Sequence, residues 1–129
     1  MEIEFRAWYE EEKFMAVVTE IKWPSYIKPE GQVHIGYVGI GGHYYVPFSS
    51  VVLMQYSGAK DVNTEAKIYD GDIVLAEYHW NVPHVLTLPA DYYDLFECGL
   101  FDCLAIEGNV FQSPHLVDKA DIYNWLENK

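Results

Sequence analysis

Five side chains with a carboxylate or amide oxygen lie close together between residues 61 and 72, and a cluster of this kind could bind a divalent cation. Calcium and magnesium prefer carboxylate and amide oxygens as ligands, and the opening alternation is similar to the start of an EF-hand loop. That loop needs glycine at its sixth position and glutamate at its twelfth, where this chain has alanine and aspartate. Ordinary turns use the same residue types. Two interpretations therefore stay open, a metal-dependent enzyme or metal-binding protein using this acidic loop, and plain turn chemistry. The side chains are Asp61, Asn63, Glu65, Asp70 and Asp72.

Two histidines and two cysteines later in the chain are enough in number for a tetrahedral zinc site. His79 and His84 are five residues apart, and so are Cys98 and Cys103. This cysteine spacing is not the usual zinc knuckle, and the neighbouring Leu and Phe residues favour a buried thiol. We therefore predict no metal site, and no cofactor.

Glycine-rich loops can also carry chemistry, and one lies at Gly39, Gly41 and Gly42. A Walker loop would continue with Gly-Lys-Ser/Thr, and a dinucleotide loop would need a small residue where Tyr44 stands. A β-hairpin turn is the simpler interpretation. Order along the chain assigns no catalytic triad, so enzyme activity is uncertain, and a non-enzymatic protein is favoured.

Most of the elements that would position these residues read as strands. Period-two alternation or β-rich composition predicts strands over 3–8, 14–23, two runs within 32–48, 50–58, 72–80 and 102–111. The acidic run 10–13 predicts a hairpin turn, and 24–31 an irregular loop.

One or two helices are expected late in the chain. Pro89 and Gly99 bracket a short one, for which the strand propensity of DYYDLF at 91–96 is the competing interpretation, and Ser113-Pro114 with Asp118 starts the last helix. An apolar stripe on the last helix contains Ile122, Tyr123, Trp125 and Leu126. The fold class is α+β, predominantly β.

Charge narrows the choice of partners. The 129 residues have a formal net charge of −12, and no Lys or Arg lies between Lys67 and Lys119. Nucleic-acid binding depends on basic side chains that displace counterions from phosphates, so no direct binding is expected. The acidity serves solubility, or it recognises a basic partner or cations.

Hydropathy predicts neither export nor membrane insertion. The start MEIEFRAW has no basic segment followed by an apolar one, and no apolar run approaches the roughly 18 residues of a membrane span. Two cysteines are too few for a disulfide framework and fit a reducing cytosol. We expect a cytoplasmic protein.

Three blocks of the sequence together resemble the YopX family of phage and prophage proteins. They are FRAW at 5–8, LMQYSGAKDVNTEAKIYDGDIVLAEY at 53–78 and LAIEGNVFQSPHL at 104–116. Relatives have Asn-Gly before the IYEGDIV segment, whereas this chain has Asn63 followed by a longer stretch without glycine. The positions that match the family pattern are Arg6, Trp8, Gln55, Tyr56, Gly58, Lys60, Asp61, Ile68, Tyr69, Gly71, Asp72, Ile73, Val74, Gly108, Asn109 and Pro114.

The resemblance implies a single domain over 1–129, of an uncharacterised phage accessory protein in the cytoplasm of a bacterial host. Residues 1–50 would form a variable β-rich part, and residues 51–129 a small SH3-like barrel with a short C-terminal helix. It implies no catalytic residue. Within it, Gly71-Asp72 is interpreted as the turn that enters a barrel strand, because glycine permits the corner and the carboxylate accepts backbone N–H bonds.

We expect the protein to act by contact with a host or phage protein, or by assembling into a homo-oligomer. The chain has more aromatic residues than a small core needs, and no active-site constellation is visible. The candidate contact residues are Tyr44, Tyr45, Tyr78 and Trp80.

Overall fold

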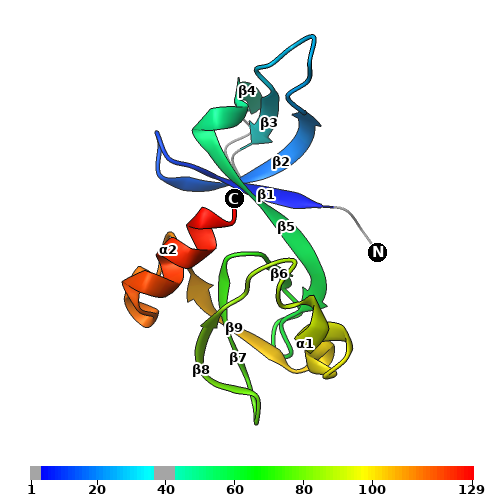
Figure 1. The fold of residues 1–129 in the computed structure, drawn as a ribbon, viewed down its shortest axis with the longest axis vertical. Coiled ribbons are helices and arrows are strands. Elements are labelled where there is room, and N and C mark those ends of the chain that lie inside the picture. The colour runs from blue at the N-terminus through cyan, green and yellow to red at the C-terminus, as the bar shows by residue number, and fades with distance from the viewer. Residues whose placement is uncertain (1–3, 37–42) are drawn as a thin grey trace. The chain divides into compact units, whose positions relative to one another are not determined.

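The structure is a computed structural model that describes residues 4–36 and 43–129 of the chain (Figure 1). The chain forms two compact units, and each is described by itself. The first is Glu4–Met54, and the second begins at Gln55 and runs to Lys129.

The first unit is built on an antiparallel meander. β1 (Phe5–Tyr9) pairs with β2 (Phe14–Lys22), β2 with β3 (Gln32–Gly36), and β3 with β4 (His43–Pro47). The acidic run after β1 forms the predicted hairpin turn, and the predicted loop joins β2 to β3. A 3-10 turn, Phe48–Ser50, leads into β5.

Alternation along these strands supplies the core of the first unit. The buried residues come from four strands, and the start of β5 packs against them through Val51 and Leu53. Burying a Val or Ile side chain contributes about 1.5–3 kcal/mol, so this small set is a large part of the unit's stability. The core residues are Ala7, Tyr9, Ala16, Val33, Ile35 and Val46.

The second unit contains three antiparallel strand pairings and two helices. β5 (Val51–Lys60) pairs with β6 (Lys67–Tyr69), and the central β7 (Asp72–Ala76) pairs with both β8 (Trp80–Val85) and β9 (Leu104–Asn109). The helices are α1 (Tyr92–Phe96) and α2 (Lys119–Glu127), and 3-10 turns cover Leu100–Asp102 and Pro114–Leu116.

The core of the second unit lies between the sheets and α1. Leu95 is the buried residue of α1, and it joins residues of β5, β6, β7 and β9 and of the segments on either side of α1. The full set is Ala59, Ile68, Val74, Ala76, Leu86, Leu88, Leu95, Leu100 and Leu104.

The prediction of a β-rich α+β fold with a short C-terminal helix is confirmed, and three details differ. The single strand predicted over 72–80 is wrong, because Tyr78 at φ 68° turns the chain into a hairpin between β7 and β8. The strand pairings found among the described residues do not close, so the SH3-like barrel stays a prediction. The stripe on α2 is narrower than expected, since Trp125 is its buried residue while Tyr123 and Leu126 are exposed.

Candidate functional site

The carboxylate of Asp61 is turned away from solvent and accepts hydrogen bonds from the backbone. Its Oδ1 accepts hydrogen bonds from the N–H groups of Asn63 (2.7 Å) and Thr64 (2.8 Å), and its Oδ2 accepts one from Ile106 (2.7 Å). The residue is buried. These bonds, with Ile106 first, hold the pKa of Asp61 below its ordinary value against the opposing effect of burial. Asp61 therefore closes its own turn and ties it to β9.

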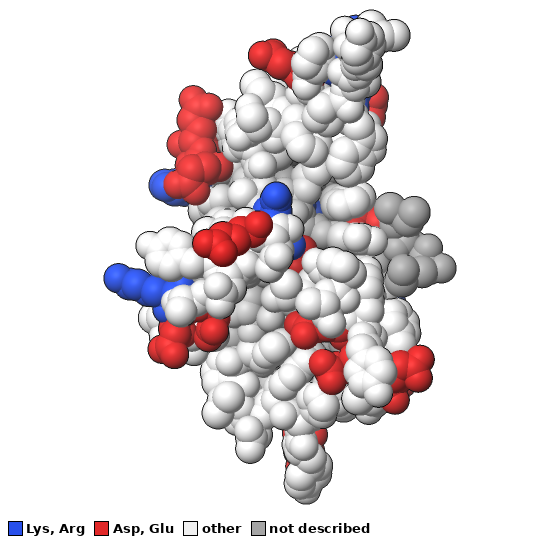
Figure 2. Space-filling view, viewed as in Figure 1, with Lys and Arg blue, Asp and Glu red and all other residues white. Residues whose placement is uncertain are grey.

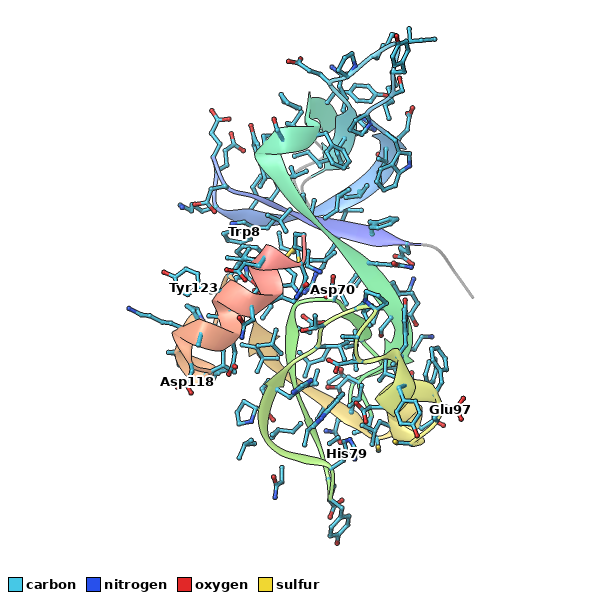
Figure 3. All side chains as sticks on the ribbon, viewed as in Figure 1. Trp8, Asp70, His79, Glu97, Asp118 and Tyr123 are labelled. Carbon is cyan, nitrogen blue, oxygen red and sulfur yellow. The ribbon has the colours of Figure 1, made fainter. Side chains whose placement is uncertain are left out.

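Asp70 is held in the same way, from three directions. Its Oδ1 accepts hydrogen bonds from Trp125 Nε1 (2.7 Å) and from the N–H of Leu88 (3.1 Å), and its Oδ2 forms an ion pair with Lys129. Both Asp70 and Trp125 are buried. The carboxylate thus anchors α2, and Figure 3 shows Asp70 beside the last turn of that helix.

Gly71 and Asp72 form the turn that enters β7, as the sequence predicts. Gly71 has φ +89°, and a Cβ there would lie 2.6 Å from Cζ2 of Trp125. Asp72 Oδ2 accepts a hydrogen bond from the N–H of Tyr69 (2.8 Å). The conformation and the packing both require glycine at position 71.

The matching positions of the last block also shape turns. Asn109 Oδ1 accepts hydrogen bonds from the N–H groups of Phe111 (3.0 Å) and Gln112 (2.9 Å). A Cβ on Gly108 would lie 2.3 Å from Ser113 Oγ, and Pro114 begins the 3-10 turn. These positions hold the end of β9 in place.

The remaining matching positions lie on strands. Gly58 has φ +90° in the irregular part of β5, and its carbonyl accepts a hydrogen bond from the Tyr56 hydroxyl (3.1 Å). Asp70 N–H donates to the carbonyl of Gln55 (2.9 Å). Arg6 lies on β1 opposite Val17.

β1 also carries Trp8, which is buried and donates from Nε1 to Glu10 Oε2 (2.7 Å). The family-matching positions described above thus each support the fold of their own unit.

The histidines and cysteines do not converge. His79 Nε2 donates to Asp94 Oδ1 (3.1 Å), and His84 Nε2 donates to Asp91 Oδ2 (2.9 Å). Burial raises the pKa of the thiols of Cys98 and Cys103, and nearby carboxylates raise it further, so the thiolate that binds metal is disfavoured. Within residues 4–36 and 43–129, no group of three or more His, Cys, Asp or Glu side chains is arranged to hold a metal ion.

A shallow polar hollow lies between β8 and α2. Its volume is about 190 Å³, below the 300–1,000 Å³ typical of small-molecule sites. His84 and Thr87 line one side, and Asp121 and Asn124 the other.

A different feature stands out on the second unit, where large aromatic side chains are exposed beside acids. Tyr78 is 94% exposed on the turn between β7 and β8, and α1 exposes Tyr93 (68%) and Phe96 (51%). Glu77 and Glu97 are also exposed. We call the set of Glu77, Tyr78, Tyr93, Phe96 and Glu97 the acidic-aromatic surface.

Local contacts connect the two elements that carry this surface. The His79–Asp94 hydrogen bond joins the β7–β8 turn to α1, and Figure 3 shows His79 on that turn and Glu97 at the end of α1. The ring of Phe96 lies 5.6 Å from that of Tyr92 and 5.3 Å from that of Phe101, so its position is fixed by packing. The exposed rings are thus presented by ordered elements.

The stretch of sequence that forms the acidic-aromatic surface carries charge of one sign. Residues 68–118 contain nine Asp and Glu and no Lys or Arg. On the face drawn in Figure 2, the region of β7, β8 and α1 shows red and no blue atoms. The acids of this region produce a negative potential that attracts cationic groups, and Lys60, which lines a hollow together with Phe101, is a basic residue on the neighbouring strand β5.

The four predicted contact residues lie in different settings. Tyr78 belongs to the acidic-aromatic surface, whereas Trp80 is half-buried and stacks on His84 with ring centroids 3.9 Å apart. Tyr45 is on β4 of the first unit, where its hydroxyl donates to Glu20 Oε2 (2.8 Å). Tyr44 pairs with Ile35 in β4, and its side chain lies outside the described residues.

Sequence reasoning missed two groups of exposed apolar residues. Tyr93 and Phe96 were expected on a short helix, and the acids flanking them were the available signal. The loop between β2 and β3 exposes Trp23 (56%), Tyr26 (102%) and Ile27 (88%). A loop that concentrates apolar residues between prolines was the signal there.

A family comparison now places the chain. The sequence profile of the family described as YopX protein matches residues 4–118. The chain belongs to the YopX family. Searches of curated proteins and of solved structures found no match. The YopX match ends before α2, although Trp125 of that helix packs on Gly71 of the family pattern.

Across residues 4–36 and 43–129, no helix combines the length and the apolar composition that crossing a bilayer requires.

Proposed function

We propose that this YopX protein is a non-enzymatic phage or prophage accessory protein that acts in the bacterial cytoplasm by binding another protein chain. The contact is made by the acidic-aromatic surface, and the partner presents basic residues. The SH3-like barrel implied by the family resemblance would be the scaffold for this surface.

One observation carries the proposal: Tyr78, Tyr93 and Phe96 are more than half exposed on ordered elements beside Glu77 and Glu97. Tyr is enriched at the centre of protein interfaces because it buries a large area at low entropic cost. Exposing large rings costs free energy, which a contact recovers.

The sign of the charge selects the partner class. An acidic surface region accelerates encounter with basic proteins and repels acidic ones. Proteins that bind nucleic acid are the most common basic proteins, and such a host protein is one variant of the partner. The same charge argues against direct nucleic-acid binding, and neither a membrane nor a cofactor enters the proposal.

The alternative, a metal-dependent enzyme using loop 61–72, receives less support. Asp61, Asp70 and Asp72 all accept hydrogen bonds from backbone N–H groups, and each stabilises a different turn. A carboxylate that accepts such a hydrogen bond would have to give it up in order to bind a metal ion.

Photo-crosslinking tests the proposal. A photoreactive amino acid replaces Tyr93 in one variant and Tyr123 in a control, since Tyr123 is 63% exposed on α2 and outside the surface. Irradiation of cells that produce the protein should give a protein adduct at position 93 and none at position 123. The E77K/E97K charge reversal should remove the adduct. Equal labelling at both positions, or an adduct that survives charge reversal, would refute the proposal.

A further inference from the structure

The loop between β2 and β3 has the opposite character to the acidic-aromatic surface. Its segment Lys22–Lys28 has lysine at both ends and no acid, within a chain that has only eight basic residues. Every residue of this segment is exposed. We call the set of Lys22, Trp23, Tyr26, Ile27 and Lys28 the basic loop.

Local contacts give the basic loop a defined shape. Ser25 N–H donates to the Lys28 carbonyl (2.8 Å), and Lys28 N–H donates to Ser25 Oγ (3.0 Å). The ring of Trp23 packs against Phe5 (5.9 Å) and Phe48 (5.6 Å). Figure 1 shows the loop extending beyond the ends of β2 and β3.

A hollow of about 650 Å³ lies beside the loop. Lys22, Trp23, Lys28 and Gln32 line it, together with one acid, Glu30. The lining thus contains one indole and two lysines, and the Lys22 ammonium lies 4.6 Å from the centroid of the Tyr45 ring. Such a lining suits an aromatic ring that comes with a carboxylate. Glu77 and Tyr78, adjacent on an exposed turn, form such a pair.

We infer that the partner of the acidic-aromatic surface is a second copy of this chain, bound through the basic loop. Tyr78 of one copy enters the hollow of the other, and its Glu77 and Glu97 face Lys22 and Lys28 there. Charge complementarity selects this occupant, because the loop has two cations and three exposed apolar residues where the surface has two acids and three exposed rings. The inference rests on the proposed function and specifies its partner.

Two different patches meet in such a contact. A heterologous contact of this kind gives a closed ring or an open chain, and a reciprocal dimer arises when two copies exchange loops. All three outcomes need the same two patches, so the same substitutions test them.

Light scattering coupled to size exclusion measures the assembly. The native chain should give a mass of at least twice 14.9 kDa that falls toward the monomer on dilution. The surface variant E77K/E97K and the loop variant K22E/K28E should each be monomeric. An equimolar mixture of the two variants should associate, because it contains one native surface and one native loop. The fourfold variant should regain assembly by reversed complementarity.

Two controls match the charge changes at exposed positions elsewhere in the second unit. E65K/E127K and K60E/K119E should assemble like the native chain, and circular dichroism should show that every variant is folded. A native chain that is monomeric at every concentration would overturn the inference. Assembly that survives both charge reversals would also overturn it. A monomeric native chain with a crosslink of foreign mass at position 93 would reject self-assembly and leave the proposed function standing.

Discussion

Replacing Gly71 by alanine should destabilise the second unit more than any ordinary glycine substitution. Gly71 has φ +89°, and the added methyl would lie 2.6 Å from Trp125 Cζ2. A side chain in the left-handed region costs about 1–2 kcal/mol. Overpacking a buried site costs about 1–3 kcal/mol more. The free energy of unfolding should therefore fall by about 2–5 kcal/mol.

Gly99 provides a matched control for this substitution. It also has positive φ, at +74°, but a Cβ there meets no atom within 4 Å. Gly99→Ala should therefore show only the conformational part, about 1–2 kcal/mol. Urea unfolding followed by circular dichroism measures the free energy of unfolding of both variants. The two values can be compared if the dependence of this free energy on urea concentration is the same in both.

A third variant separates the clash from the conformational cost. Phenylalanine at position 125 removes the indole atoms that crowd position 71, so in the Trp125→Phe background Gly71→Ala should cost about as much as Gly99→Ala. Such a coupling is what a double-mutant cycle detects between residues in contact. Equal destabilisation by the two glycine substitutions in the native background would refute the assignment of Trp125 as the cover of this turn.

Three further predictions follow from the same unit. Trp125→Ala should lower the free energy of unfolding by about 3–5 kcal/mol, a loss measurable by urea unfolding, because it empties a buried site and removes one of the donors to Asp70. A loss below about 1 kcal/mol would show that α2 is not anchored there. Asp61→Asn should cost about 1–3 kcal/mol at neutral pH, since Asn63, Thr64 and Ile106 lose a charged acceptor. The folded pKa of Asp61 lies below its ordinary value of about 3.9, so its stabilisation is present above that pH and is lost as the pH falls through the folded pKa. The free energy of unfolding should therefore fall less steeply with decreasing pH in Asp61→Asn than in the native chain. An identical pH profile would contradict the role of the carboxylate. A thermal scan with Ca²⁺, Mg²⁺, Mn²⁺ and Zn²⁺ should leave Tm unchanged, whereas a rise that Asp61→Asn abolishes would restore the metal interpretation.

Local patterns in the sequence predict most of the strands because the chain alternates or carries β-branched residues where one face is buried. The β1–β2 hairpin, the pairing of β3 with β4 and the strand at β9 all follow from such patterns, whereas the turn predicted at Gly39, Gly41 and Gly42 lies outside the described residues. The register between β7 and β9 shifts next to Gly108, from Gly108 opposite Ile73 to Ile106 opposite Val74.

Features set by distant contacts could not be predicted from local patterns. Nothing near Tyr78 marks a turn, since it is neither Gly, Asn nor Asp, and yet it adopts φ 68° between two strands. The partners of Asp61 and Asp70 are similarly remote, because Ile106 lies 45 residues beyond Asp61 and Trp125 lies 55 residues beyond Asp70. Sequence spacing alone therefore left the metal interpretation open.

The sequence predicts that a contact surface contains exposed aromatic residues, but it does not identify all of those residues. An excess of aromatic residues pointed to an exposed set, but which rings face solvent depends on packing. Trp80 is covered by its stacking on His84, whereas Phe96 stays 51% exposed because Leu95 takes the buried position on α1. The five-residue helix is too short to show an apolar period that would have separated these positions.

The central claim is that the acidic-aromatic surface binds a basic, aromatic segment of protein. The most direct measurement is a fluorescence anisotropy titration of a labelled peptide of residues 21–29, which contains both lysines and no acid, with the full chain. The peptide should bind the native chain saturably and more weakly at high salt. Binding should be lost in E77K/E97K and kept in E65K/E127K. Absence of binding to the native chain, or equal binding to both charge variants, would contradict the central claim.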